Sequence, residues 1–157
     1  MTTSAESQER VRPRLLSTTA PAAVVLIRIV VGAIFLSEGI QKFLFPAKLG
    51  PGRFATQTPL PDPAAWAYLD GAFEIGCGVL IILGLLTRLA TIPMIIDMVG
   101  AEVFTKVPVL IHHGFWQYAS DARAELSQFF GLVFLLIVGG GAWSLDALLT
   151  SRAARRR

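Results

Sequence analysis

Four long apolar stretches alternate with polar segments along the chain of 157 residues. They cover roughly residues 22–44, 66–86, 89–111 and 125–149. Each is close to the roughly 20 residues that an α-helix needs to cross the hydrocarbon core of a bilayer. The pattern therefore predicts an all-α integral membrane protein, folded as an antiparallel four-helix transmembrane bundle.

The segments between these stretches predict three different connections. Residues 45–65 contain five prolines, which cannot continue a helix, so an outer loop is expected there. Thr87 and Arg88 form a very short turn after Gly84. Residues 112–122 hold aromatic side chains of the kind found at the boundary between lipid and water.

Composition favours the membrane class over the soluble and disordered classes. Apolar residues make up 54% of the chain and charged residues 16%, against about 25% charged in soluble domains. Such hydrophobicity excludes a disordered chain. A soluble helical bundle is the alternative, because only the last stretch has a charge-free run near 20 residues, from Leu126 to Leu145. That bundle would need a polar outer face on each helix, which these stretches lack.

Basic residues predict the orientation of the chain. Of the 14 Lys and Arg residues, eight lie in residues 1–19, the 87–88 turn and residues 151–157. By the positive-inside rule these segments face the cytoplasm, so both termini are expected inside a bacterial-type plasma membrane. The two terminal segments are then cytoplasmic tails around a membrane domain of residues 20–150. The net charge of +3 is therefore attributed to the basic residues that set the membrane orientation, and no nucleic-acid partner is expected.

The first apolar stretch is expected to stay in the protein as a membrane anchor. Arg28 interrupts it, it is long for the apolar core of a signal peptide, and no small-residue cleavage site follows it.

Ionisable residues recur inside the predicted spans, where they are costly and mark candidate functional sites. At about 100° per residue they fall on polar stripes that also carry glycine, which suits close helix packing. The three stripes comprise Arg28, Gly32, Phe35, Gly39 and Lys42; Asp70, Glu74, Cys77, Ile81 and Gly84; and Glu125, Gln128, Leu132, Leu135 and Gly139.

The predicted topology places many of these polar groups at one depth, in the outer half of the membrane. Two interpretations stay open, a polar network that holds the bundle together and the lining of a ligand pocket or proton path. The candidate residues are Glu38, Lys42, Asp70, Glu74, Glu102, Lys106 and Gln128. In the inner half, Arg28 and Asp97 are expected to form a structural ion pair between the first and third helices.

The third helix presents a geometric difficulty. Asp97 lies well away from Glu102 and Lys106 around the helix axis, so all three can face one place only if the helix is distorted. Pro93 and Pro108 allow such a distortion. Glu102 and Lys106 also have the i, i+4 spacing of a local ion pair.

No metal site is predicted. Cys77 is the single cysteine, so an intrachain disulfide, a Cys-x-x-Cys pair and a cysteine-based metal site are excluded. His112 and His113 are adjacent in a predicted outer loop, which is typical of surface residues. Any redox chemistry would therefore need a bound cofactor or a partner protein.

Short motifs between about residues 24 and 149 form a combination typical of one family. They are Leu26-Ile27-Arg28, Gly32, Phe35, Glu38-Gly39, Lys42-Phe43, Gly71, Phe73-Glu74, Gly78, Leu80, Gly84 to Ala90, Pro93 to Met98 and Trp143 to Asp146. The combination resembles the DoxX family of membrane proteins. The resemblance implies a four-helix inner-membrane protein associated with quinol oxidase or thiosulfate:quinone oxidoreductase activity. It also implies association with soluble redox or sulfur-handling enzymes in oxidative-stress defence.

Two positions depart from the family pattern. Glu38 stands where many relatives carry His, and Cys77 stands where many carry Gly. A histidine-based metal or haem role is therefore not expected, while proton exchange at position 38 stays open.

The preferred functional hypothesis is a membrane subunit or anchor of a redox system, with a quinone-like ligand or a proton pathway in the polar outer layer. Glu38, Asp70 and Glu74 would exchange protons with quinone oxygens, and Lys42 would stabilise a developing negative charge. Electrons would come from a soluble redox enzyme. The apolar ring would lie among Phe35, Phe73 and Trp66.

Two alternatives come from other functional classes. A small proton or solute transporter would need a continuous polar route between the two leaflets. A structural scaffold would use its charges to join helices and its surface to recruit a soluble enzyme.

Overall fold

The computed structural model describes residues 21–154, and within this range the chain forms helices without any strand. The all-α class is confirmed. The predicted N-terminal tail, residues 1–19, and the last three residues of the C-terminal tail lie outside the described residues.

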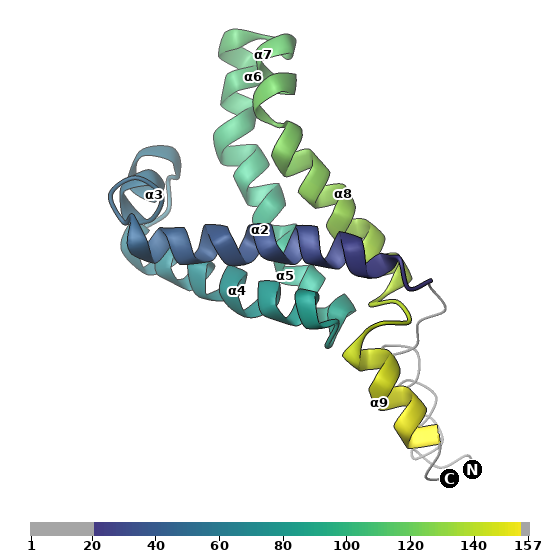
Figure 1. Ribbon diagram of the computed structural model, residues 1–157. Helices are drawn as coiled ribbons and strands as arrows, with labels where there is room; N and C mark the ends of the chain where they lie inside the picture. Colours follow the sequence, from purple (N-terminus) through teal and green to yellow (C-terminus); the bar gives the residue numbers. More distant parts are fainter. Residues whose placement is uncertain (1–20, 155–157) are drawn as a thin grey trace, which may run out of the picture.

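Two helices of 21 residues each, α2 (Val24–Leu44) and α4 (Pro63–Leu83), lie side by side as an antiparallel pair (Figure 1). Among the described residues these two are long and apolar enough to cross a membrane. Glycine permits their close approach. A Cβ atom on Gly39 would lie 2.7 Å from the carbonyl oxygen of Gly71, and one on Gly32 would lie 2.6 Å from Cγ1 of Ile82. The backbones touch because no side chain separates them.

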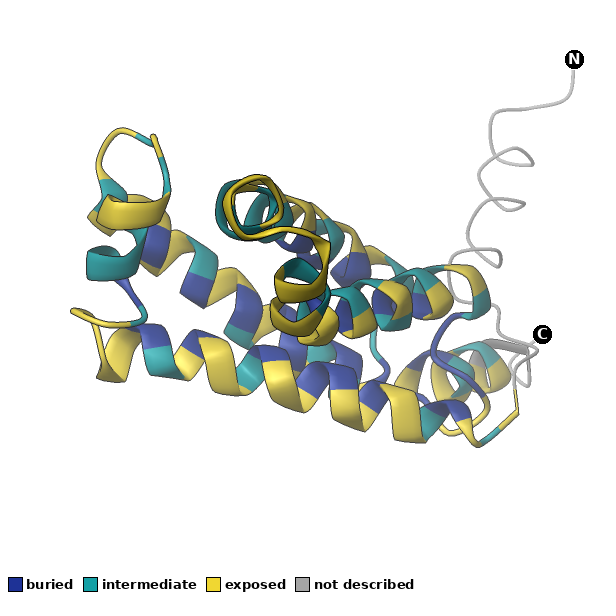
Figure 2. Cartoon of the chain, turned by 90° about the horizontal axis from the view of Figure 1, so that it is seen from above, coloured by how far each residue is buried: buried dark blue, intermediate teal, exposed yellow. Residues whose placement is uncertain are grey.

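The predicted polar stripe of the first helix is confirmed as its buried face. Arg28, Gly32, Phe35, Gly39 and Lys42 are all buried in α2. Exposed residues lie on the outward sides of the helices and buried residues where helices face each other (Figure 2). The apolar core comes mainly from α2, α4, α5 and α8.

The proline-rich connection is partly helical, which the prediction of a loop at residues 45–65 missed. It contains the short helix α3 (Pro51–Gln57). Proline is favoured at the first position of a helix, because a backbone N–H there would have no partner within the helix. Asp62 then caps α4, since its side chain accepts a hydrogen bond of 3.2 Å from the backbone N–H of Ala65.

The second half of the chain forms another helical hairpin. Its first arm is a continuous helical run of α5 (Thr87–Ala101), the π-helix η1 (Glu102–Lys106) and α6 (Val107–His113). The short helix α7 (Phe115–Asp121) lies at the tip, within the predicted 112–122 loop, and α8 (Arg123–Val138) returns along α5. His112 and His113 end α6 at exposed positions.

Of the two prolines that allow a distortion of the third helix, Pro108 follows one, the π-helix η1. Pro108 has no N–H, and in an α-helix its ring would clash with the carbonyl four residues earlier. A wider turn relieves that clash, and the N–H of Val107 donates to the carbonyl of Glu102, five residues back. The Thr105 hydroxyl donates to the carbonyl of Ala101 at 2.6 Å.

The apolar stretch 125–149 is not one helix, so that prediction is wrong. Helix α8 ends at Val138, where Gly139 adopts φ 84° and ψ −166°. Residues 139–144 are not helical, and α9 (Leu145–Ala154) follows in a new direction (Figure 1). The pair of α5 and α8 crosses the pair of α2 and α4 at a steep angle, and α6 and α7 project beyond it. The four long, nearly antiparallel helices of the expected bundle are therefore not seen.

Arg28 joins the two hairpins through backbone carbonyls. Its Nε donates to Ile81 (3.1 Å), its Nη2 to Ile82 (2.7 Å), and its Nη1 to Gly140 (2.7 Å) and Trp143 (2.6 Å). These acceptors lie at the C-terminal end of α4 and in the non-helical segment after α8.

The predicted ion pair between Arg28 and Asp97 is wrong, because each donor group of the guanidinium is taken by carbonyls and no salt bridge joins the two residues.

Asp146 completes this junction by capping α5. Its carboxylate accepts hydrogen bonds from the backbone N–H groups of Leu86 (2.8 Å) and Thr87 (3.1 Å) and from the Thr87 hydroxyl (3.2 Å). Gly84 ends α4 with φ +67°, and a Cβ atom there would lie 2.7 Å from Cζ of Arg28. The close approach and the left-handed backbone both require glycine at this position.

Candidate functional site

A cavity of about 700 Å³ lies between the two hairpins, with α3 at one side. Most of its lining is apolar. Its ionisable and amide side chains come from five helices and are Glu38, Gln41, Lys42, Arg53, Gln57, Asp70, Glu74, Asp97, Glu125 and Gln128. The cavity therefore combines the size and apolar lining of a small-molecule site with convergent polar groups.

One wall of the cavity, formed by α2 and α4, carries a buried charge cluster. Lys42 Nζ donates to Asp70 Oδ2 and to Glu74 Oε2, the latter at 2.5 Å, and the Glu74 side chain is 1% exposed. Lys42 Nζ also lies 5.8 Å from the centre of the Phe54 ring on α3. Buried charges persist when they are paired and hydrogen bonded, and this cluster meets both conditions.

The opposite wall, formed by α5 and α8, carries polar atoms without partners. Glu125 Oε2 and Gln128 Nε2 are buried and make no hydrogen bond, whereas the Asp97 carboxyl group interacts with that of Asp70 on the facing wall. Gln128 as a whole is 6% exposed. The charges of Asp70, Lys42 and Glu38 act on Asp97, so Asp97 belongs to this cavity and not to the Arg28 junction.

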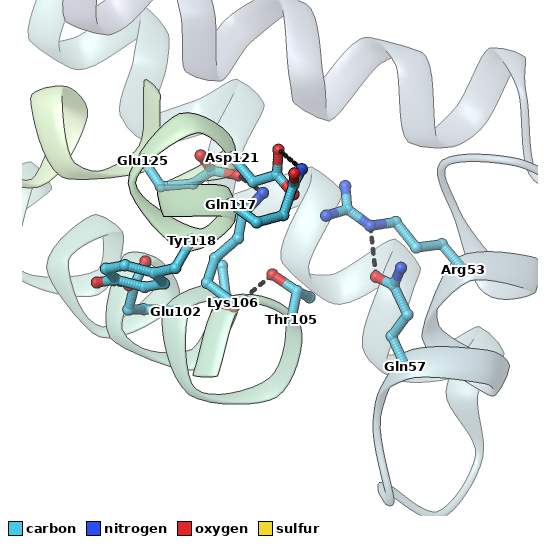
Figure 3. Close-up of polar contacts among 10 residues, drawn as sticks. Arg53, Gln57, Glu102, Thr105, Lys106, Gln117, Tyr118, Asp121 and Glu125 are labelled. Carbon is cyan, nitrogen blue, oxygen red and sulfur yellow. Dashed lines mark hydrogen bonds and ion pairs between the residues drawn. The ribbon is translucent and has the colours of Figure 1, made fainter. Parts of the chain in front are cut away.

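A second polar cluster lies around η1, α7 and α8 and meets the cavity at Glu125 (Figure 3). Lys106 pairs with Glu125 at 2.7 Å, and the Tyr118 hydroxyl donates to Glu102 Oε1. The bond to Glu102 raises the pKa of Tyr118, which lies on the connecting helix α7. Glu102 and Lys106 do not line the cavity, so the single polar layer expected from the sequence is divided into two clusters.

Arg53 on α3 stands at the rim of the cavity. Its Nε donates to Gln57 at 2.8 Å, and its guanidinium extends away from α3 toward the side on which α7 lies (Figure 3). Phe35 and Trp66 line the cavity as expected. Phe73 does not, and its side chain is 49% exposed, so its predicted place around an apolar ring is wrong.

The structure brings together five of the seven candidate residues, Glu38, Lys42, Asp70, Glu74 and Gln128, in one cavity. Sequence reasoning left Asp97, Glu125 and Arg53 outside the candidate set. Asp97 and Glu125 carried a usable signal, since an ionisable group inside a predicted span is a site candidate by default. Arg53 carried none, because α3 was expected to be a loop.

Apolar side chains separate the polar groups of the cavity from the Arg28 junction along α4, α5 and α8, while on α2 the cavity lining extends to Ile27. Ile81 on α4, Met94 on α5, and Leu132 and Leu135 on α8 are all fully buried. Along each helix they lie between the cavity residues and the residues near Arg28. The polar groups of the cavity and those of the junction are therefore not continuous along these helices.

Comparison with known proteins identifies the family of the chain. The DoxX family profile matches residues 23–107. The chain is 52% identical over 147 residues to the uncharacterized membrane protein Rv3486 of Mycobacterium tuberculosis, covering 90% of each chain. It is 33% identical over 129 residues to an uncharacterized protein of Haemophilus influenzae, covering 80% of this chain and 90% of the relative. No solved structure matches significantly. The chain belongs to the DoxX family of membrane proteins.

Proposed function

We propose that this protein is a membrane subunit or anchor of a redox system and that its cavity binds a quinone-like ligand. The observation that carries the proposal is one cavity of about 700 Å³ that holds both aromatic side chains and a group of buried ionisable residues. Cavities of roughly 300–1,000 Å³ with apolar linings and a few polar groups are typical of small-molecule sites.

The polar residues would act on the oxygens of the ligand ring. Glu38, Asp70 and Glu74 would exchange protons with them, and Lys42 would stabilise negative charge that develops on reduction. Asp70 and Glu74 hold the Lys42 ammonium at the cavity wall. Electrons would come from a soluble redox enzyme, since quinone chemistry needs an electron donor.

We propose that the chain crosses a bacterial plasma membrane four times, with both termini in the cytoplasm. Helices α2 and α4 have the length and composition of spans. The helical run from Thr87 to His113 and α8 would supply the other crossings. The basic residues in both tails would then face inward, in agreement with the positive-inside rule. So would Arg88, which lies in the first turn of α5 because the connection falls at residues 84–86 and not at 87–88 as predicted.

Transport is a less favoured function. A transporter needs a polar route between the leaflets, and the apolar layer of Ile81, Met94, Leu132 and Leu135 interrupts such a route. The scaffold hypothesis differs from the proposal in requiring no ligand in the cavity, so an experiment on the cavity separates the two.

The test is affinity purification of the tagged protein in mild detergent, with mass spectrometry of co-purifying proteins and of extracted lipophilic cofactors. We expect a stoichiometric soluble redox enzyme and a bound quinone. Glu74→Gln and Lys42→Met are expected to reduce bound quinone and quinone-linked electron flow in membranes at least about tenfold, because each removes a buried charge-assisted hydrogen bond.

Lys48→Met is the matched control, because Lys48 is exposed and does not line the cavity. Unchanged quinone content and electron flow in both cavity variants would reject the ligand site. If the partner enzyme were still bound in that case, the scaffold function would replace the proposal.

A further inference from the structure

The cavity continues along α2 as a groove that is open at its side. Its α2 lining runs from Ile27 to Lys42 at helical spacing, so one face of the helix borders it throughout. In this lining Val30 is 58% exposed, and on the facing helix α5 the lining residue Ile96 is 68% exposed. Side chains that line a cavity and are this exposed border an opening. Where α2 crosses the bilayer, that opening faces lipid.

The polar end of the groove holds a positive and a negative side chain that are not paired with each other. Glu38 on α2 and Arg53 on α3 both line the cavity, and their charges interact. No salt bridge joins these two described residues, and the hydrogen bond of the Arg53 guanidinium runs from Nε to Gln57. The two Nη groups of Arg53 and the Glu38 carboxylate are therefore available to a ligand.

The charges of the cavity select the ligand headgroup. Lys42 is already bound by Asp70 and Glu74, so it offers no free cation. A purely anionic headgroup would meet an excess of carboxyl groups. A headgroup with both a phosphate and an ammonium would place the phosphate on the Arg53 fork and the ammonium on Glu38. The ionisable residues of the lining are five acids and two bases, namely Glu38, Asp70, Glu74, Asp97 and Glu125 against Lys42 and Arg53.

The apolar part of the groove has the length of one lipid tail. At 1.5 Å per residue, α2 rises about 16 Å from Ile27 to Glu38, and a tail fills one leaflet of hydrocarbon, about 15 Å. All α2 residues that line the cavity between these two positions are apolar. An acyl chain that starts near Glu38 would therefore bury its apolar area along α2 as far as Ile27.

We propose that this groove binds one phospholipid with a primary ammonium in its headgroup, of the phosphatidylethanolamine type. Its phosphate lies at Arg53, its ammonium at Glu38 and one acyl chain along α2 from Ile34 to Ile27. The inference goes beyond the proposed function, since this lipid and a quinone-like ligand are alternative occupants of one cavity. It depends on the placement of α2 across the membrane, for which the helix has the length and composition.

The test is native mass spectrometry of the full-length protein, delipidated in detergent and titrated with one of three phospholipids that have the same acyl chains. We expect phosphatidylethanolamine to bind at least about tenfold more tightly than phosphatidylglycerol, which has no ammonium for Glu38. It should bind at least about threefold more tightly than phosphatidylcholine, whose ammonium has no N–H to donate.

Two pairs of variants locate the headgroup. Glu38→Gln is expected to remove most of the preference over phosphatidylglycerol, whereas Glu102→Gln should keep it, because Glu102 does not line the cavity. Arg53→Gln is expected to weaken all three lipids at least about fivefold, since each carries a phosphate. Lys48→Gln is its control, because Lys48 is exposed and lies outside the lining.

A third pair of variants locates the acyl chain. Val30→Trp fills the groove and is expected to weaken binding of each lipid at least about fivefold. Ile29→Trp should leave binding unchanged, because Ile29 is exposed on the same helix but does not line the cavity. Equal affinity of the unaltered protein for the three lipids, binding of none, or a preference that survives Glu38→Gln and Arg53→Gln would overturn the proposal.

Failure of this inference is distinct from failure of the proposed function. If no lipid is preferred while quinone co-purifies and electron flow depends on Lys42 and Glu74, only the lipid site is wrong. If the lipid preference depends on Glu38 and Arg53 while neither quinone nor a redox enzyme co-purifies, the redox function is wrong and the lipid site remains.

Discussion

At the scale of single residues, the ionisable groups inside the helices have two separate roles. Arg28 and Asp146 bind backbone groups at helix ends and hold the two hairpins together. Lys42, Glu74 and Asp97 line the cavity. The family motifs around Gly84 and Asp146 are therefore explained by the junction, whereas those around Lys42 and Glu74 belong to the cavity.

Arg28→Lys is expected to lower the free energy of unfolding by at least about 2 kcal/mol. A lysine cannot reproduce the guanidinium fork, so some of the four carbonyls would lose their donor at a cost of about 1–3 kcal/mol each. Thermal unfolding in detergent measures the change. Asp97→Asn should lower the free energy of unfolding much less, because Asp97 is not a partner of Arg28. If Arg28→Lys and Asp97→Asn lowered the free energy of unfolding equally and the double variant lowered it no further, an ion pair between Arg28 and Asp97 would be indicated after all.

Lys42→Met is expected to cost about 3–5 kcal/mol, because it leaves two carboxylates buried without their cation. The double variant Lys42→Met with Glu74→Met should lose less than the sum of the two single variants, since one uncompensated charge is removed. A double-mutant cycle from unfolding curves in detergent checks this. Strict additivity would show that the pair is not coupled.

At the scale of elements, glycine decides how closely α2 and α4 approach. Gly39 faces the Gly71 carbonyl across the interface, while Gly76 on α4 has no atom within 4 Å of an added Cβ. Both are helical glycines, so the difference between them is their packing. The sequence predicted Gly39 as an interface residue because it shares a stripe with Lys42 and Arg28.

Gly39→Ala is expected to destabilise the protein by about 1–3 kcal/mol, because the added methyl group would overlap backbone atoms of α4. Gly76→Ala is the control and should be neutral or stabilise by up to about 1 kcal/mol, since alanine is the better helix former. Unfolding in detergent measures both. Similar effects of the two substitutions would contradict the packing seen here.

At the scale of the whole molecule, a cavity lies between two crossing hairpins. The Arg28 junction lies at one end, and α3 and α7 lie toward the other (Figure 1). If the membrane orientation proposed above holds, α3 and α7 face the outside and α9 faces the cytoplasm.

Cysteine labelling tests that orientation. In a Cys77→Ala background, Thr56→Cys on α3 and Gln117→Cys on α7 should react with a membrane-impermeant maleimide in intact cells, because both positions are exposed. Ser151→Cys on α9 should react only after the membrane is opened. Labelling of position 151 in intact cells, or absence of labelling at position 56, would contradict the proposed orientation.

Sequence alone was sufficient for the class, the buried faces and much of the site. Helical periodicity and apolar composition are local properties, so the stripe from Arg28 to Lys42 and the candidates Glu38, Asp70, Glu74 and Gln128 could be located without coordinates. That Pro93 and Pro108 allow a distortion of the third helix also followed from the sequence, since the missing N–H is a property of proline itself.

Only the tertiary structure decided which partners these residues meet. Arg28 binds carbonyls from α4 and from the turn after α8, and backbone carbonyls are present at every position, so no side-chain pattern marks them. For the same reason Asp97 could be assigned to the cavity only from the packing of α5 against α8. The crossing of the hairpins and the end of α8 at Gly139 likewise depend on contacts between segments that are far apart along the chain.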